Sequence, residues 1–91
     1  MSSLALEFPP HAVALRFTGD SLVVTLHDGR ELSVPLAWFP RLVHATPDQL
    51  TQFEWLGMGE GIHWPALDED ISVLGLLEGR PSTELRPTPN P

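Results

Sequence analysis

The sequence has no cysteine, no lysine and no tyrosine, and no hydrophobic run approaches the length of a membrane span. Without cysteine the chain cannot form a disulfide, which fits a reducing cytoplasm. A membrane helix needs about 18 consecutive apolar residues, and polar side chains interrupt every run here sooner. Residues 1–10 carry Glu7 and no basic side chain, so they lack the positive start of a signal peptide. These absences predict a soluble, cytoplasmic protein.

Positive charge is also scarce. The basic side chains are five scattered arginines, whereas 12 acids, most of them in the second half, give a formal net charge of −7. Binding to DNA or RNA usually depends on a basic patch that neutralises phosphates, so this composition disfavours direct nucleic-acid binding. A basic protein partner matches the acidic second half better. The alternative is that the charge simply keeps a small protein in solution.

The chain of 91 residues is long enough for one domain and short enough to be marginally stable. A domain of this size buries only about 60% of its unfolded surface, so a homodimer or a permanent partner would supply useful further burial. We expect a flexible lead at residues 1–11, where Pro9 and Pro10 discourage regular structure. After this lead we expect a single domain over residues 12–79 and then a disordered, proline-rich tail over residues 80–91.

The first part of the domain has the pattern of strands. Three segments are β-branched and apolar or alternate polar with apolar residues, namely 12–17, 22–26 and 31–34. Turn residues separate the first two, and the Asp28–Gly29 pair favours the positive φ of a tight hairpin turn. Three strands joined by two short turns predict an antiparallel meander.

The pattern becomes helical after this meander. Over residues 35–45, apolar side chains recur at helix-like intervals, and Pro35 and Pro40 each suit a first turn. We expect one or two short helical turns here that lay Trp38 or Phe39 against the sheet, because large aromatic side chains of this kind usually belong to the core.

A second helix is predicted over Pro47–Phe53. Thr46 can cap it, proline suits the first helical position, and Gln49 completes a capping box. The end of this helix is open to two interpretations, because residues 53–56 alternate and can equally begin a fourth strand. Residues 57–61 are rich in glycine and predict a loop.

The last element is expected at Ile71–Glu78, as a short helix capped by Asp70 and closed by Gly79 at the C′ position. A strand that begins at Ile71 is the competing interpretation, since residues 71–73 alternate. The predicted fold class is α+β, a small antiparallel sheet packed with two or three short helices. The sheet is a three-stranded meander with room for a fourth strand.

The stretch from Gly59 to Asp70 combines glycines, an imidazole, an indole and three consecutive acids. Glycine lets the backbone turn or approach a partner closely, and a tryptophan can bury a large apolar area. We interpret it as a structured recognition loop. Its candidate partner-binding residues are Glu60, His63, Trp64, Asp68, Glu69 and Asp70.

In this interpretation Trp64 is the apolar anchor and the acids supply charge complementarity. Arg41 is expected to pair with one of the acids inside the domain. The competing interpretation is structural: Asp68 and Asp70 then bond to backbone amides at a turn or cap, as short acids commonly do.

No catalytic residue, cofactor or metal site is predicted. His63 precedes the acids by five residues, unlike the fixed spacing of His-Glu-x-x-His. A phosphate-binding loop requires a lysine, which the chain lacks, and no long helix follows the glycines as a dinucleotide site requires. No serine lies in a Gly-x-Ser-x-Gly elbow. An orphan enzyme or metal-binding protein therefore ranks last among the alternatives.

Several strings resemble a bacterial family known as domain of unknown function 2442. They are Asp28–Arg30, Val34–Leu42, Ala45–Pro47, Gly59–Pro65 and Leu67–Val73. The resemblance covers residues 12–79, and Met58 and Leu74 depart from its pattern, where glycine and a polar residue are expected. It implies a small α+β domain without catalytic residues. Members are often encoded beside another small protein, as in toxin–antitoxin pairs.

We therefore expect a non-enzymatic interaction module, an antitoxin-like partner of a small basic toxin or nuclease. The first alternative is an accessory or sensor domain of a transcriptional regulator whose DNA-reading module lies on another chain. Salt-dependent DNA binding by the isolated protein would favour that alternative. Both hypotheses leave open whether residues 59–70 hold the fold together or face a partner.

Overall fold

The structure is a computed structural model, and it describes residues 10–82. Most of the predicted lead at residues 1–11 and of the predicted tail at residues 80–91 lies outside the described residues. At the described end of that tail, the backbone N–H of Ser82 donates a hydrogen bond to the carbonyl oxygen of Trp38 over 3.0 Å. None of the helices within residues 10–82 is long and apolar enough to cross a membrane.

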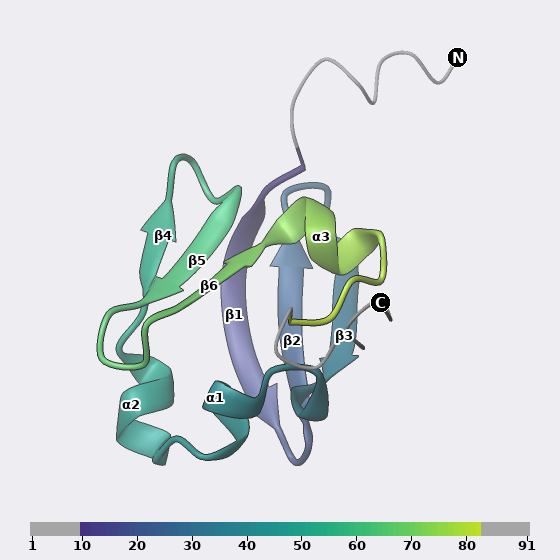
Figure 1. The fold of residues 1–91 in the computed structure, drawn as a ribbon. Helices are drawn as coiled ribbons and strands as arrows, with labels where there is room; N and C mark the ends of the chain where they lie inside the picture. Colours follow the sequence, from purple (N-terminus) through teal and green to yellow (C-terminus); the bar gives the residue numbers. More distant parts are fainter. Residues whose placement is uncertain (1–9, 83–91) are drawn as a thin grey trace, which may run out of the picture.

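The predicted meander is present. Its strands pair antiparallel in the order β1-β2-β3 (Figure 1), and they span Ala12–Thr18, Ser21–Leu26 and Glu31–Pro35. The Asp28–Gly29 turn forms as expected: the Asp28 carboxylate accepts a hydrogen bond from the Arg30 backbone N–H, and Gly29 has φ +94°. Within the meander, the central strand β2 is the most deeply buried, with Leu22 and Val24 fully removed from solvent.

Short helical segments follow the meander. A 3-10 turn spans Leu36–Trp38, α1 spans Pro40–Val43 and α2 spans Pro47–Thr51. Phe39, between the first two, is buried in the core, as expected. The capping box of α2 is complete, because the Thr46 hydroxyl accepts from the Gln49 N–H at 3.2 Å and the Gln49 amide oxygen accepts from the Thr46 N–H at 2.9 Å.

Residues 54–72 form a second antiparallel sheet in the order β4-β5-β6, with strands Glu54–Leu56, Gly61–Trp64 and Glu69–Ser72. The predicted fourth strand exists as β4, but it pairs with β5 and does not join the meander. The expectation of a loop over Gly59–Asp70 is therefore wrong for most of that stretch. Residues 65–68 form the tight connection between β5 and β6, with Asp68 in a left-handed conformation at φ +53°.

The helix α3 covers Val73–Leu77 and follows β6 directly. Its cap is Ser72, whose hydroxyl accepts from the Gly75 N–H at 3.1 Å. The prediction that Asp70 caps this helix is wrong, because Asp70 lies two residues earlier, on the strand. Both interpretations of this segment were partly right, because Ile71 belongs to the strand β6 and the helix α3 begins at Val73. Gly79 occupies the expected C′ position with φ +77°.

The two sheets share one hydrophobic core and meet at the turn between β4 and β5. The Ala12 N–H of β1 donates to the Gly59 carbonyl of this turn over 2.8 Å. Gly59 is required here, because a Cβ atom would lie 2.2 Å from the Ala12 carbonyl oxygen. The fully buried side chains of the core are Trp64, Leu22, Leu42, Ile62, Val24 and Val73.

Candidate functional site

One charged row crosses the outer face of the second sheet. The register places Glu54 of β4 opposite His63 of β5, and His63 opposite Asp70 of β6. Residues opposite each other in a ladder project from the same face, so the imidazole lies between two carboxylates. His63 Nδ1 forms a hydrogen bond and an ion pair with Asp70 Oδ1. This row is the clearest polar constellation of the candidate stretch.

The hydrogen bond to Asp70 raises the pKa of His63 above its ordinary value of 6.5. Desolvation opposes this change, and the negative charges of Asp70, Glu54 and Asp68 reinforce it. The imidazole is partly exposed and the Asp70 carboxylate mostly exposed, so water and salt screen the pair. Protonation of His63 therefore sets how much negative charge the row presents.

The backbone of Asp68 is held in place by Arg41, whereas its side chain is exposed to solvent. Arg41 Nη1 donates to the Asp68 carbonyl over 2.6 Å and lies 3.5 Å from the Asp68 carboxylate. The expectation that Arg41 pairs with one of the acids is confirmed. The Asp68 side chain is nonetheless 94% exposed, so its carboxylate faces solvent beside the charged row.

Trp64 belongs to the core and not to the surface. It is 0% exposed, and the indole Nε1 donates to the Leu50 carbonyl over 3.0 Å. Its ring lies near those of Phe17 and Phe53. The prediction that Trp64 anchors a partner is wrong, because it is already enclosed on all sides by this domain. This site gives the large indole both an apolar environment and a hydrogen-bond acceptor, which a buried tryptophan needs.

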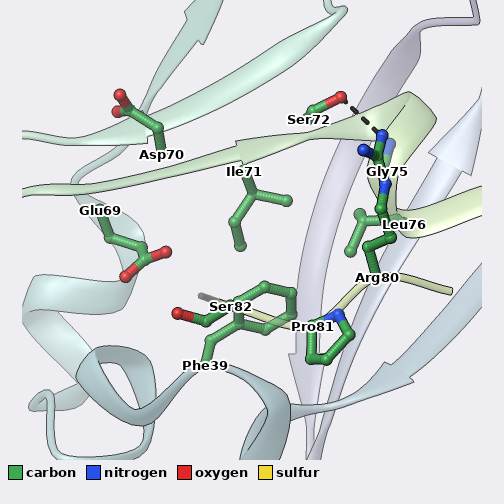
Figure 2. A pocket seen from close by; sticks show the side chains of 10 residues that line it. All are labelled: Phe39, Glu69, Asp70, Ile71, Ser72, Gly75, Leu76, Arg80, Pro81 and Ser82. Carbon is green, nitrogen blue, oxygen red and sulfur yellow. Dashed lines mark hydrogen bonds between the residues drawn. The ribbon is translucent and has the colours of Figure 1, made fainter. Parts of the chain in front are cut away.

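Glu69 also lies inside, at 8% exposure. Figure 2 shows Glu69 and Asp70 on opposite sides of β6, with Glu69 directed towards Phe39 and Ser82. The cavity in that view measures about 250 Å³, and residues of α3 and residues 80–82 form part of its lining. Small-molecule pockets usually measure about 300–1,000 Å³, so this cavity falls just below the usual size. Glu69 is thus corrected from a surface residue to an interior one.

Glu60 stabilises the turn between β4 and β5. Its carboxylate accepts a hydrogen bond from the Met58 N–H over 2.9 Å. Of the six candidates, His63, Asp68 and Asp70 share the outer face and its rim, whereas Glu60, Trp64 and Glu69 serve the fold. Glu54 was missed, although the alternation of residues 53–56 that favoured a strand was the signal for it.

Each arginine within residues 10–82 already has a carboxylate partner. The pairs are Arg16–Glu31 at 3.0 Å, Arg30–Asp28 at 2.8 Å, Arg41–Asp68 at 3.5 Å and Arg80–Glu78 at 2.8 Å. The charged row therefore receives no arginine from this part of the chain. The same residues contain no group of three or more histidine, cysteine, aspartate or glutamate side chains arranged to hold a metal ion.

This α+β arrangement of two small sheets agrees with the comparisons to known proteins. The family model described as "Protein of unknown function (DUF2442)" matches residues 12–82, and the chain belongs to this family. The resemblance read from the sequence is thus confirmed. No curated protein matches the chain significantly.

Two solved structures are similar along most of the chain. A crystal structure of a protein of unknown function from Rhodospirillum rubrum shares 35% identity and a TM-score of 0.70, covering 82% of this chain and 93% of that one. A solution NMR structure of an uncharacterized protein from Chromobacterium violaceum shares 30% identity and a TM-score of 0.69, covering 89% and 75%. The family and the fold are therefore established together.

Proposed function

We propose that this protein is a non-enzymatic interaction module, an antitoxin-like partner that masks a basic surface on a small toxin or nuclease. The proposal takes its class of partner from charge and its antitoxin character from the gene arrangement implied by the family resemblance. The absence of cysteine and the bacterial family lead us to place this role in the cytoplasm.

The observation that supports the proposal is the imbalance of charge on the outer face of the second sheet. Glu54 and Asp70 flank one histidine, and the nearby Asp68 carboxylate stays 94% exposed although Arg41 lies 3.5 Å from it. Each arginine within residues 10–82 is engaged by a carboxylate. Cationic side chains of a partner would complete this face and speed association through electrostatic steering.

The test begins with the full chain carrying an affinity tag in its native cell. We expect it to capture one small basic protein. Expressed alone in a test bacterium, that protein should arrest growth, and co-expression with the wild-type chain should restore it. Capture without any effect on growth would contradict the antitoxin role, and absence of a captured basic protein would contradict the proposal as a whole.

Charge-removing variants link the result to the surface. Asp68→Asn with Asp70→Asn keeps side-chain shape, and asparagine tolerates the left-handed backbone of residue 68. The pair should weaken capture by roughly tenfold or more, as expected for losing two charge contacts at an interface. The matched control, Asp20→Asn with Asp48→Asn, removes the same charge elsewhere and should leave capture nearly unchanged. Equal loss in both variants would assign the effect to net charge alone.

A further inference from the structure

The strand β4 forms an open edge of the second sheet. It pairs only with β5 in the order β4-β5-β6, and all three of its residues are exposed. Figure 1 shows β4 on the outside of the molecule, with no element of residues 10–82 beyond it. An edge of this kind can accept another strand unless charge, proline or a covering segment blocks it.

One hydrogen bond fixes which backbone groups face this edge. The Val73 N–H donates to the Glu60 carbonyl, and the register places these residues opposite each other, next to the Gly61–Ser72 pair. Bonded and non-bonded pairs alternate along an antiparallel ladder, so Ile62 turns its N–H and C=O towards β6. Trp55 lies opposite Ile62 and therefore turns its own N–H and C=O away from β5, to the open edge.

The side chains beside these backbone groups are apolar and acidic. Trp55 is 38% exposed, Leu56 is 41% exposed, and Met58 in the following turn is 80% exposed. Glu54 lies on the outer face, in the same row as His63 and Asp70. A strand added here would meet apolar surface and negative charge together.

We propose that the edge of β4 binds an extended, basic segment of a partner protein, which adds to the second sheet as a further strand. Main-chain hydrogen bonds to Trp55 provide affinity, and alternate side chains provide specificity. Arginine or lysine residues of the segment lie on the face of Glu54, and apolar residues lie on the face of the Trp55 ring. This inference rests on the proposed function and gives the binding surface of that partner.

Charge selects this occupant over a second copy of the chain. A second copy carries the same net charge of −7 and would bring its own acidic row to the edge, where the two rows repel. A basic segment instead supplies the cations that no arginine of residues 10–82 is left to provide.

The test uses a defined probe and the isotopically labelled full-length chain. The probe is a capped hexapeptide of alternating arginine and valine, titrated while hydrogen exchange of the Trp55 amide is followed by NMR. We expect exchange of this amide to slow by about fivefold or more at saturation, as for one gained hydrogen bond. Peptides with glutamate in place of arginine, or with methyl groups on every backbone nitrogen, should bind at least about tenfold more weakly.

Three results of the peptide titration would overturn the inference. They are equal binding of the methylated peptide, an effect of the probe confined to residues away from β4, and strong protection of the Trp55 amide before any peptide is added. The last result would mean that another part of the chain already covers the edge.

Two variants with one control complete the test. Trp55→Pro removes the edge N–H, and proline is tolerated on edge strands. If this variant fails to fold, Glu54→Arg, which reverses one exposed charge, decides instead. Each variant should bind the arginine–valine peptide about tenfold more weakly, whereas the control Asp20→Arg should bind it with unchanged affinity. Unchanged binding by Glu54→Arg would overturn the inference.

The two proposals can fail separately. If the native partner is captured and neutralised but Glu54→Arg and Trp55→Pro still bind it, the edge is not the docking surface and the proposed function stands. If the peptide adds to β4 but no basic partner is captured from the native cell, the result supports strand addition at β4 and contradicts the antitoxin-like role.

Discussion

At the scale of single residues, two adjacent acids of β6 meet opposite environments. Successive side chains of a strand point to opposite faces, so Glu69 enters the interior while Asp70 joins the exposed row beside His63. The same alternation buries Trp64 and leaves its neighbour His63 half-exposed. An acidic run that reads as one surface feature in the sequence is thus divided between the core and the outer face.

The His63–Asp70 pair should titrate in a predictable direction. Because the pKa of His63 is raised in the folded protein, the pair stabilises the fold fully below about 6.5 and loses this contribution as the pH rises through the raised value. NMR titration of the imidazole should therefore give a pKa above 6.5 in the wild type and a lower one in Asp70→Asn. An unchanged pKa in the variant would show that Asp70 is not the cause.

Trp64→Ala should destabilise the domain severely. Removal of a fully buried indole typically costs about 3–5 kcal/mol, a large part of the roughly 5–15 kcal/mol that stabilises a small domain. Urea unfolding measured by circular dichroism should show this loss. Met58→Ala, at the most exposed large hydrophobic side chain among residues 10–82, is the control and should change stability by less than about 0.5 kcal/mol. Near-equal stability of both variants would contradict the assigned core position.

At the scale of elements, the junction between the sheets depends on a backbone that only glycine fits. Gly59 has φ +106°, and its carbonyl accepts from the Ala12 N–H. Gly29 has a similar φ of +94° in a turn where a Cβ would meet nothing within 4 Å. Both positions therefore require a positive φ, but only Gly59 also lacks the space for a Cβ atom.

This difference defines a matched pair of variants. Gly29→Ala should cost about 1–2 kcal/mol for its left-handed backbone alone. Gly59→Ala should cost about 1–3 kcal/mol more, because its Cβ would lie 2.2 Å from the Ala12 carbonyl oxygen and force the sheets apart. Chemical unfolding of both variants measures the difference. Equal costs would mean that the junction relaxes without penalty.

The elements that could be predicted from the sequence are those specified by neighbouring residues. The Asp28–Gly29 hairpin and the capping box at Thr46 each depend on side chains within a few positions of one another. The second sheet was not predicted as a sheet, because β4, β5 and β6 are only three or four residues long and gain stability from the core they cover. The burial of Trp64 and Glu69 was missed for the same reason, because segments distant in the sequence decide it.

At the scale of the whole molecule, the described arginines form ion pairs within the domain, and the acids outnumber them. The four arginines of residues 10–82 pair with acids, while the net charge of the chain stays at −7. Such a molecule attracts basic surfaces over a distance set by the ionic strength.

Complex formation with the proposed basic partner should therefore depend on salt. Raising the ionic strength from about 0.1 M to about 1 M shortens the screening length from roughly 10 Å to 3 Å, and the association rate should fall about tenfold or more. Stopped-flow measurements would record this dependence, which should be shallower for Asp68→Asn with Asp70→Asn. An association rate that does not change with salt would exclude electrostatic steering.

The bond between Ala12 and Gly59 also bears on the order in which the chain folds. Each sheet is built from consecutive strands joined by short turns, so each can form through local encounters. The bond at the junction joins distant parts of the chain and closes a long loop, at an entropic cost that local contacts avoid. The sheets should therefore dock late, after the folding transition state. A defect at Gly59 would then mainly accelerate unfolding and leave the folding rate nearly unchanged.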